Sequence, residues 1–122
     1  MSDFIVEGLD HVSITTPEEL EEEVLAFYES SLGLKRLVKP EGTRQAGGWF
    51  AIGDTQLHVS RDSHNPPVTQ HFAVKVDAFD AVVARLRGAG FHIEQGRPIP
   101  GGRRFFTRDP AGNRVEIVSY DR

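Results

Sequence analysis

The sequence contains no cysteine. A disulfide framework, a thiolate metal site and a cysteine nucleophile are therefore excluded, and any metal ion must be held by His, Asp or Glu. Basic residues are also in deficit, because 14 Lys and Arg stand against 18 Asp and Glu, which gives a formal net charge of -4. That balance argues against nucleic acid as a partner, since phosphate neutralisation requires clustered basic residues.

Long apolar runs are missing as well. No stretch approaches the roughly 20 apolar residues that cross a bilayer. The start, Met1-Ser2-Asp3, lacks the basic and apolar regions of a signal peptide. We therefore expect a cytoplasmic protein with no membrane partner. The 122 residues, 39% of them hydrophobic, are enough for one globular domain over residues 1–122.

The first half of the chain has the pattern of one strand, one helix and three strands. Residues 9–15 alternate between polar and apolar positions, which predicts a strand. A helix should follow, with Thr16 as its N-cap and an end near Gly33. Its apolar residues at helical spacing are Leu20, Val24, Phe27 and Tyr28. Strands are then expected over residues 35–39, 48–52 and 55–60.

The second half repeats this order after a linker over residues 61–69, which contains Asn65-Pro66-Pro67. A strand over residues 70–76 precedes a helix that ends at Gly90. Further strands are expected over residues 91–94, 103–107 and 114–119. The chain is therefore predicted to contain two β-α-β-β-β modules, about residues 8–62 and 69–120, in an α+β fold.

The stretch Asp109-Pro110-Ala111-Gly112-Asn113 is dense in turn-forming residues. The proline fixes φ, the glycine tolerates a positive φ, and the Asp and Asn side chains can bond to their own backbone. A β-rich segment follows, Val115-Glu116-Ile117-Val118, in which Glu116 points away from its apolar neighbours. If those neighbours pack in the core, Glu116 needs a cation or a metal ion as its partner on the other face.

Aligning the two modules places four polar residues at equivalent positions. His11 and His71 stand in the first strand of each module, and His58 and Glu116 stand in the last. The other face of each of these strands is apolar, so all four side chains can point to one concave surface. Two His and one carboxylate form the ligand set of open non-haem iron sites, and a metal with free positions can polarise a carbonyl or activate water.

Each of these residues also has a structural interpretation. A single His on a strand is more often a hydrogen-bonded structural residue than a ligand. Glu116 can instead form a salt bridge with Arg103, Arg104 or Arg114. The matching positions across the repeat favour the metal site over these separate interpretations.

The whole chain resembles the vicinal oxygen chelate superfamily, which groups glyoxalase I, fosfomycin resistance proteins, extradiol dioxygenases, methylmalonyl-CoA epimerase and bleomycin resistance proteins. The matching segments are Leu9-Asp10-His11-Val12, Phe27-Tyr28 through Leu32-Gly33-Leu34, Gln56-Leu57-His58-Val59, His71-Phe72-Ala73-Val74-Lys75-Val76, and Phe105-Phe106 through Asp109-Pro110-Ala111-Gly112-Asn113-Arg114-Val115-Glu116. The resemblance implies a cupped mixed sheet around a metal, with helices on the outer face. It also implies that His11, His71 and Glu116 occupy the usual ligand positions. His58 falls where some members carry a metal-binding Glu and others a residue that does not bind.

From the resemblance and the matched residues we expect a divalent-metal-dependent enzyme of the glyoxalase/dioxygenase type. It would carry out lyase, isomerase or dioxygenase chemistry on a small oxygenated organic molecule. The ion (Fe, Mn, Ni, Co or Zn) would be held by His11, His58, His71 and Glu116, and Glu116 and His11 are the candidate catalytic residues.

The alternative is a metal-free protein of the bleomycin-resistance type that sequesters an aromatic or drug-like ligand. Trp49, Phe50 and Phe106 are the candidate residues of the substrate pocket, although such aromatic residues more often belong to the core.

A homodimer is expected as well. The open sheet edges of each module need a partner, and in many short members of the superfamily the modules pair across two chains. The short linker, stiffened by Pro66-Pro67, limits how one module folds over the other. Each of two sites would then take His11 and His58 from one chain and His71 and Glu116 from the other.

Overall fold

The protein, for which we have a computed structural model, is described over residues 3, 5–65 and 68–121. Its first module contains β1 (His11–Thr16), α1 (Glu21–Ala26), β2 (Lys35–Leu37), β3 (Gly48–Ile52) and β4 (Thr55–Arg61). Its second module contains β5 (His71–Lys75), α2 (Phe79–Gly88), β6 (Glu94–Gln95), β7 (Gly102–Arg108) and β8 (Arg114–Tyr120). The predicted order of elements is confirmed in both modules, and the strand expected over residues 91–94 is the two-residue β6. Pro66 and Pro67 of the predicted linker lie outside the described residues.

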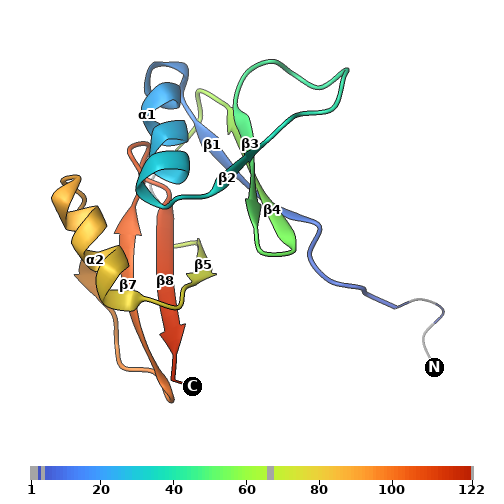
Figure 1. Cartoon of the computed structure of the whole chain (residues 1–122). Coiled ribbons are helices and arrows are strands. Elements are labelled where there is room, and N and C mark those ends of the chain that lie inside the picture. The colour runs from blue at the N-terminus through green and yellow to red at the C-terminus, as the bar shows by residue number, and fades with distance from the viewer. Residues whose placement is uncertain (1–2, 4, 66–67, 122) are drawn as a thin grey trace.

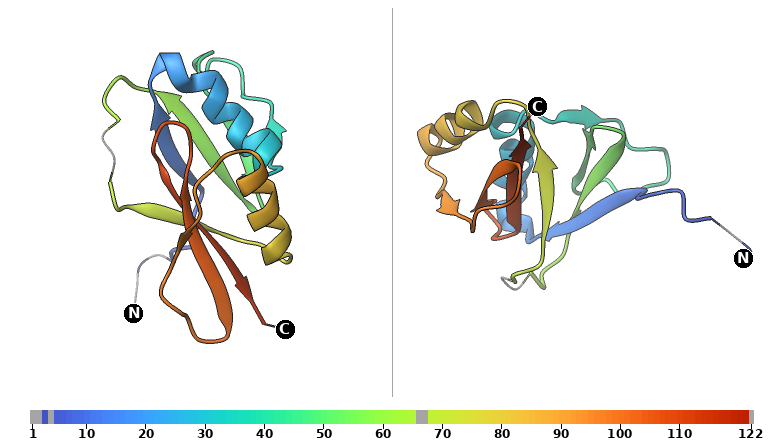
Figure 2. Two further views of the ribbon diagram at one scale, coloured as in Figure 1. Left: turned by 90° about the vertical axis from the view of Figure 1, so that its left-hand side faces the viewer. Right: turned by 90° about the horizontal axis from the view of Figure 1, so that it is seen from below.

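Each module forms its own four-stranded mixed sheet, with strand orders β1-β4-β3-β2 and β5-β8-β7-β6 (Figure 1). The first strand of each module runs parallel to the last, and the other neighbours are antiparallel. The α+β fold with tandem modules is therefore confirmed, while the cupped sheet is divided into two. β5, an edge strand of its sheet, lies toward the first module (Figures 1 and 2).

The first helical segment is less regular than its sequence suggests. A 3₁₀ turn over Glu18–Leu20 precedes α1, and a π-helical turn over Phe27–Ser31 follows it. The prediction of Thr16 as N-cap is wrong. Pro17 takes the capping position without a side-chain bond, and the Thr16 hydroxyl donates to the carbonyl of Pro17 at 3.0 Å. The segment ends as expected at Gly33, whose φ of 73° is readily adopted by glycine.

One hydrophobic core joins the two modules. It includes Phe27 and Tyr28 from the π-helical turn, together with strand residues of both sheets such as Leu57 and Ile117. The ring of Phe27 stacks on that of Phe91, which follows α2, with centroids 4.7 Å apart. This packing occupies the helix-covered faces of the sheets. None of the helices in the described part of the chain is long and apolar enough to cross a membrane.

Candidate functional site

A hydrogen-bonded cluster of Tyr28, Asp109 and Asn113, here called the inter-module latch, fixes how the modules sit together. Asp109 Oδ1 accepts bonds from the backbone N–H groups of Ala111 and Asn113, at 2.9 and 3.0 Å, so the predicted turn is confirmed. Asp109 Oδ2 accepts bonds from the Tyr28 hydroxyl at 2.7 Å and from Asn113 Nδ2 at 2.9 Å. Asn113 Nδ2 also donates to the carbonyl of Thr15 in β1, at 2.9 Å.

The carboxyl group of Asp109 is almost completely buried. Asp109 is only 4% exposed and Tyr28 is fully buried. Burial raises the pKa of Asp109, and the bonds from Tyr28 and Asn113 oppose that rise because they stabilise the carboxylate. Burial also raises the pKa of Tyr28 well above its ordinary value, and the neighbouring carboxyl group adds to the effect. Tyr28 therefore remains the donor in this bond.

His11 and His58 form the first of two half-sites. Their rings stack with centroids 4.0 Å apart, and the ring of Trp49 stacks on the other side of His58 at 3.8 Å. Asp10 Oδ2 lies 2.8 Å from His11 Nδ1, so when Nδ1 carries the proton the lone pair of the ring is on Nε2. Gln56 Oε1 lies 2.8 Å from His58 Nε2. Burial lowers the pKa of His58, and the neighbouring His11 lowers it further.

His71 and Glu116 form the second half-site. His71 Nε2 lies 3.0 Å from Glu116 Oε1, and His71 Nδ1 lies 3.1 Å from the carbonyl oxygen of Thr69. Parallel pairing of β5 with β8 produces this contact, since His71 is paired with Arg114, two residues before Glu116. Arg104 Nη1 lies 3.9 Å from Glu116 Oε2, so one of the three expected arginine partners is close to the carboxylate.

A single chain does not bring the four predicted ligands together. His11 and His58 lie on the first sheet, while His71 and Glu116 lie on the second. Within the part of the chain that the structure describes, no group of three or more His, Asp or Glu side chains is close enough to hold a metal ion. Each module therefore presents a pair of candidate ligands, and the pairs are separate.

The donor chemistry of each half-site fits a divalent metal ion. The carbonyl of Thr69 and the carboxylate of Glu116 only accept hydrogen bonds, so both His71 contacts require two N–H groups on one imidazole. Alternatively, His71 and Glu116 would both act as ligands of a divalent metal ion, and the Nδ1–H of His71 would remain on the Thr69 carbonyl. Metal-binding His residues usually donate their second N–H to an oxygen in this way, and Asp10 offers His11 the same support.

The three predicted pocket aromatics do not share one surface. Trp49 lies against His58, and Phe106 lies edge-on to His71 with ring centroids 5.1 Å apart. Phe50 is fully buried in the core beside Tyr28, so its assignment to the pocket is wrong. The reason is strand alternation: Phe50 follows Trp49 on β3 and therefore points to the helix-covered face.

Several residues that support the half-sites were not identified from the sequence. Asp10 adjoins His11, Gln56 stands two positions before His58, and Thr69 stands two positions before His71. Because Gln56 lies two positions before His58, strand alternation places both side chains on the same face, and this spacing was the signal available in the sequence. Asp10 is adjacent to His11, so alternation places it on the opposite face of the strand predicted over residues 9–15, and Thr69 precedes the strand predicted over residues 70–76. Alternation therefore did not predict either contact.

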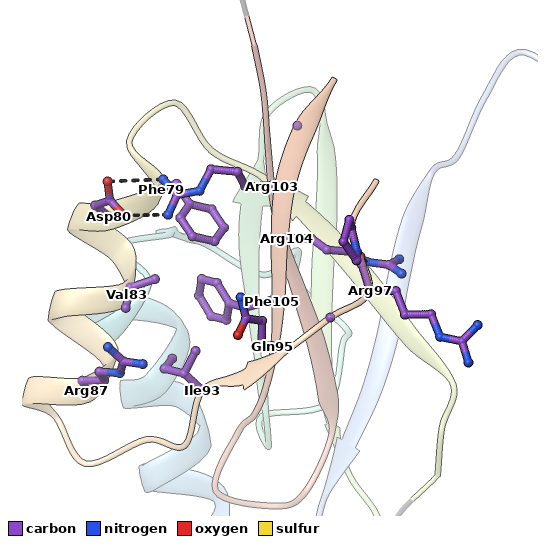
Figure 3. A pocket seen from close by; sticks show the side chains of 13 residues that line it. Phe79, Asp80, Val83, Arg87, Ile93, Gln95, Arg97, Arg103, Arg104 and Phe105 are labelled. Atoms are coloured by element: carbon purple, nitrogen blue, oxygen red, sulfur yellow. Dashed lines mark hydrogen bonds and ion pairs between the residues drawn. The ribbon is translucent and has the colours of Figure 1, made fainter. Parts of the chain in front are cut away.

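Cavities lie beside both half-sites and also elsewhere. One of about 380 Å³ is lined by His11, His58 and Trp49, and one of about 350 Å³, between β1 and β5, is lined by His71 and Arg114. A third, of about 460 Å³, lies between α2 and β7 (Figure 3). None of the four predicted ligands is among its lining residues, and Phe105 forms part of its apolar wall.

Comparison with known proteins gives consistent matches over nearly the whole chain. A family model described as Glyoxalase/Bleomycin resistance protein/Dioxygenase superfamily matches residues 8–117. A structure from Bacillus anthracis, described as that of a glyoxalase family protein, is 31% identical with a TM-score of 0.88, over 99% of this chain and 100% of that one.

Two further structures have the same fold at lower identity. The antibiotic-binding protein TnmS3 from Streptomyces sp. CB03234 is 22% identical with a TM-score of 0.78, over 97% of this chain and 99% of that one. The E126Q variant of the fosfomycin resistance protein FosX from Listeria monocytogenes, complexed with Mn(II) and 1S,2S-dihydroxypropylphosphonic acid, is 17% identical with a TM-score of 0.78. That match covers 95% of this chain and 94% of the other.

Proposed function

The chain belongs to the Glyoxalase/Bleomycin resistance protein/Dioxygenase superfamily, and on that premise we propose that it is a divalent-metal-dependent enzyme acting on a small oxygenated organic molecule. The observation that carries this proposal is the His71–Glu116 pair. His71 Nε2 and Glu116 Oε1 lie 3.0 Å apart, and the second ring nitrogen is already on the Thr69 carbonyl, so a divalent cation would find two ligands side by side in this pair.

The residues that would hold the ion are His11, His71 and Glu116, with His58 a weaker fourth ligand. A divalent ion in such a site acts as a Lewis acid on a substrate oxygen. The chain's own groups have separate tasks. Asp10 and Thr69 orient the imidazoles through Nδ1. Glu116 and His11 are the groups able to take or return a proton beside the substrate.

Metal binding is the direct test. Protein purified without a His-tag should bind one Fe, Mn, Ni, Co or Zn ion per site at micromolar concentration, measured by calorimetry or elemental analysis. His71→Ala should abolish stoichiometric binding while the circular dichroism spectrum stays native, because His71 is an exposed strand residue outside the core. His64→Ala is the matched control, since His64 is exposed and lies in the segment between β4 and β5 rather than on a strand that carries a candidate ligand. Failure of the wild-type protein to bind any of the ions contradicts the proposal.

We further propose that the complete site is shared between two chains. Each chain supplies one pair of ligands from each module, and the pairs do not meet within it. A two-fold axis that sets the first sheet of one chain against the second sheet of its partner completes two equivalent sites. Each site then contains His11 and His58 from one chain and His71 and Glu116 from the other.

Subunit mixing tests this arrangement. His11→Ala and His71→Ala homodimers should each lack intact sites. After subunit exchange, both lesions of a heterodimer fall in the same site and the other site is intact, so about one metal ion per heterodimer should bind. A protein that is monomeric by light scattering, or mixtures that never regain metal binding after exchange, would rule out the shared site.

The second candidate function is metal-free sequestration of an aromatic ligand. It is favoured by the three-ring stack of Trp49, His58 and His11, which offers a flat aromatic surface beside a cavity of about 380 Å³. The structural likeness to the antibiotic-binding TnmS3 is compatible with it. If no metal binds, quenching of the fluorescence of Trp49, the only tryptophan, by planar aromatic compounds becomes the relevant measurement.

A further inference from the structure

The face of the second sheet that carries Glu116 is rich in arginine, although the chain as a whole is acidic. Phe106 is paired directly with Glu116 across β7 and β8. Arg104 stands two positions before Phe106, and Arg114 stands two positions before Glu116, so both arginines share this face. Arg103, the neighbour of Arg104, points the other way, toward α2 (Figure 3).

Both arginines are partly buried and lie against one aromatic ring. Their side chains are 25% exposed for Arg104 and 19% for Arg114, and their guanidinium carbons lie 5.4 and 3.7 Å from the centroid of Phe106. Each forms a long ion pair with a carboxylate: Glu116 Oε2 is 3.9 Å from Arg104, and Glu94 Oε1 is 4.0 Å from Arg114. Neither separation is a hydrogen bond.

The guanidinium groups therefore keep donors for a ligand. Each arginine has five N–H groups in a planar fork. In the described part of the chain, Arg104 uses Nε on the carbonyl of Arg97 at 3.0 Å, and Arg114 uses Nη1 on the carbonyl of Thr69 at 3.3 Å. The other N–H groups of each guanidinium are not used in these two bonds. The pairing of Arg104 with Glu116 would weaken if Glu116 gave its charge to a metal ion.

We propose that Arg104 and Arg114 form a binding subsite for an oxyanion, so that the substrate is a small organic acid with a carboxylate or phosphonate group. The assignment of that acid as substrate rests on the function proposed above. The planar fork matches two oxygens of either group, and the Phe106 ring fixes the orientation of both forks. An anion held there places the rest of the same molecule beside Glu116 and His71, which is the positioning a reaction at that pair requires.

Anion binding to the wild-type protein and three variants tests the subsite. Methylphosphonate is titrated and followed by ³¹P NMR, with its neutral dimethyl ester as the uncharged probe and acetate as the competing carboxylate, at constant ionic strength. Arg104→Gln and Arg114→Gln should each weaken methylphosphonate binding about 10-fold or more, since a charge-assisted bond is lost. Acetate should displace methylphosphonate if the subsite accepts carboxylates, and should fail to do so if it is specific for phosphonates.

Arg103→Gln is the matched control. It removes the same charge from the adjacent position of β7, but its guanidinium is bound to Asp80 at 3.0 and 3.3 Å on the opposite face. The affinity for methylphosphonate should change by less than about 2-fold, because the effect of removing a distant, exposed charge is largely screened. Equal losses in the Arg103 and Arg104 variants, equal binding of the neutral ester, or no detectable binding of either anion would overturn the proposal.

Metal binding, measured on the same variants by the EPR signal of Mn(II), separates this proposal from the function on which it rests. Arg104→Gln should bind Mn(II) at least as well as the wild type, because a cation near Glu116 is removed. If Mn(II) binds and the anion result fails, the subsite is wrong and the enzyme proposal stands. If the wild type binds no metal ion, the enzyme proposal fails, and anion titration still decides whether the arginines form a binding site.

Discussion

Tyr28→Phe removes one hydroxyl group and should lower the free energy of unfolding, because it breaks the inter-module latch. The Tyr28 hydroxyl donates to Asp109 Oδ2 at 2.7 Å, across 81 positions of sequence. Both residues are buried, so water does not replace the lost donor. A hydrogen bond to a charged group contributes roughly 1.5–3 kcal/mol. The ring is retained, so no cavity loss adds to this figure, which is a large share of a typical stability of about 5–15 kcal/mol.

The size of the loss should depend on pH. Because burial raises the pKa of Asp109 above 3.8, the folded protein holds this proton more tightly than the unfolded chain. Stability therefore falls as the pH rises from the ordinary Asp pKa through the raised one. The bond from Tyr28 lowers the pKa of Asp109 and so limits that fall. Without the bond the fall is larger, and the difference between variant and wild type should be greater near about pH 7.5 than near about pH 4.

Urea unfolding followed by circular dichroism measures the effect, at both pH values and at one fixed protein concentration, since subunit association contributes to apparent stability. Tyr120→Phe is the matched control, because Tyr120 is 53% exposed and its loss of a hydroxyl should change stability by less than about 0.5 kcal/mol. If Tyr28→Phe costs no more than Tyr120→Phe, or costs as much in acid as at neutral pH, the role assigned to the latch is refuted.

Two further predictions concern the site and the backbone. Isothermal titration should show that His58→Ala lowers metal affinity far less than Glu116→Ala, because His58 Nε2 is already engaged by Gln56; equal losses would contradict that ranking. Gly47→Ala should cost about 3 kcal/mol or more, since φ is 80° and a Cβ would lie 2.0 Å from the carbonyl oxygen of Val59. Gly53→Ala, with φ of 54° and open space, should cost about 1 kcal/mol, and a similar urea midpoint for the two variants would disagree with this account.

Much of the local structure was predictable because it depends on short-range periodicity. The alternation in residues 9–15 identified β1, and the repeat of one element order identified both modules. The turn at Asp109 to Asn113 was recognisable from residue types alone, since Asx side chains bond backbone groups only a few positions away. The matching positions of His71 and Glu116 in the repeat also identified them as candidate ligands from the sequence alone.

Local patterns were insufficient where two alternatives look alike in sequence. Trp49 and Phe50 are both large and aromatic, and both were assigned to the pocket on residue type, although adjacent residues of one strand point to opposite faces; the structure shows that Phe50 is the one in the core. The start of the first helical segment was misjudged by one residue, because Thr16 is an acceptable cap but its hydroxyl donates to the carbonyl of Pro17 instead.

The sequence by itself determined the elements, their order and the four candidate ligands, because periodicity, turn chemistry and residue type act within a few positions. Only the tertiary structure decided that the strands form two sheets, that Tyr28 reaches Asp109, and that the ligands stand as two separate pairs. These features depend on contacts between segments tens of residues apart. Their geometry follows from how the two modules share one core, and no local pattern encodes that packing.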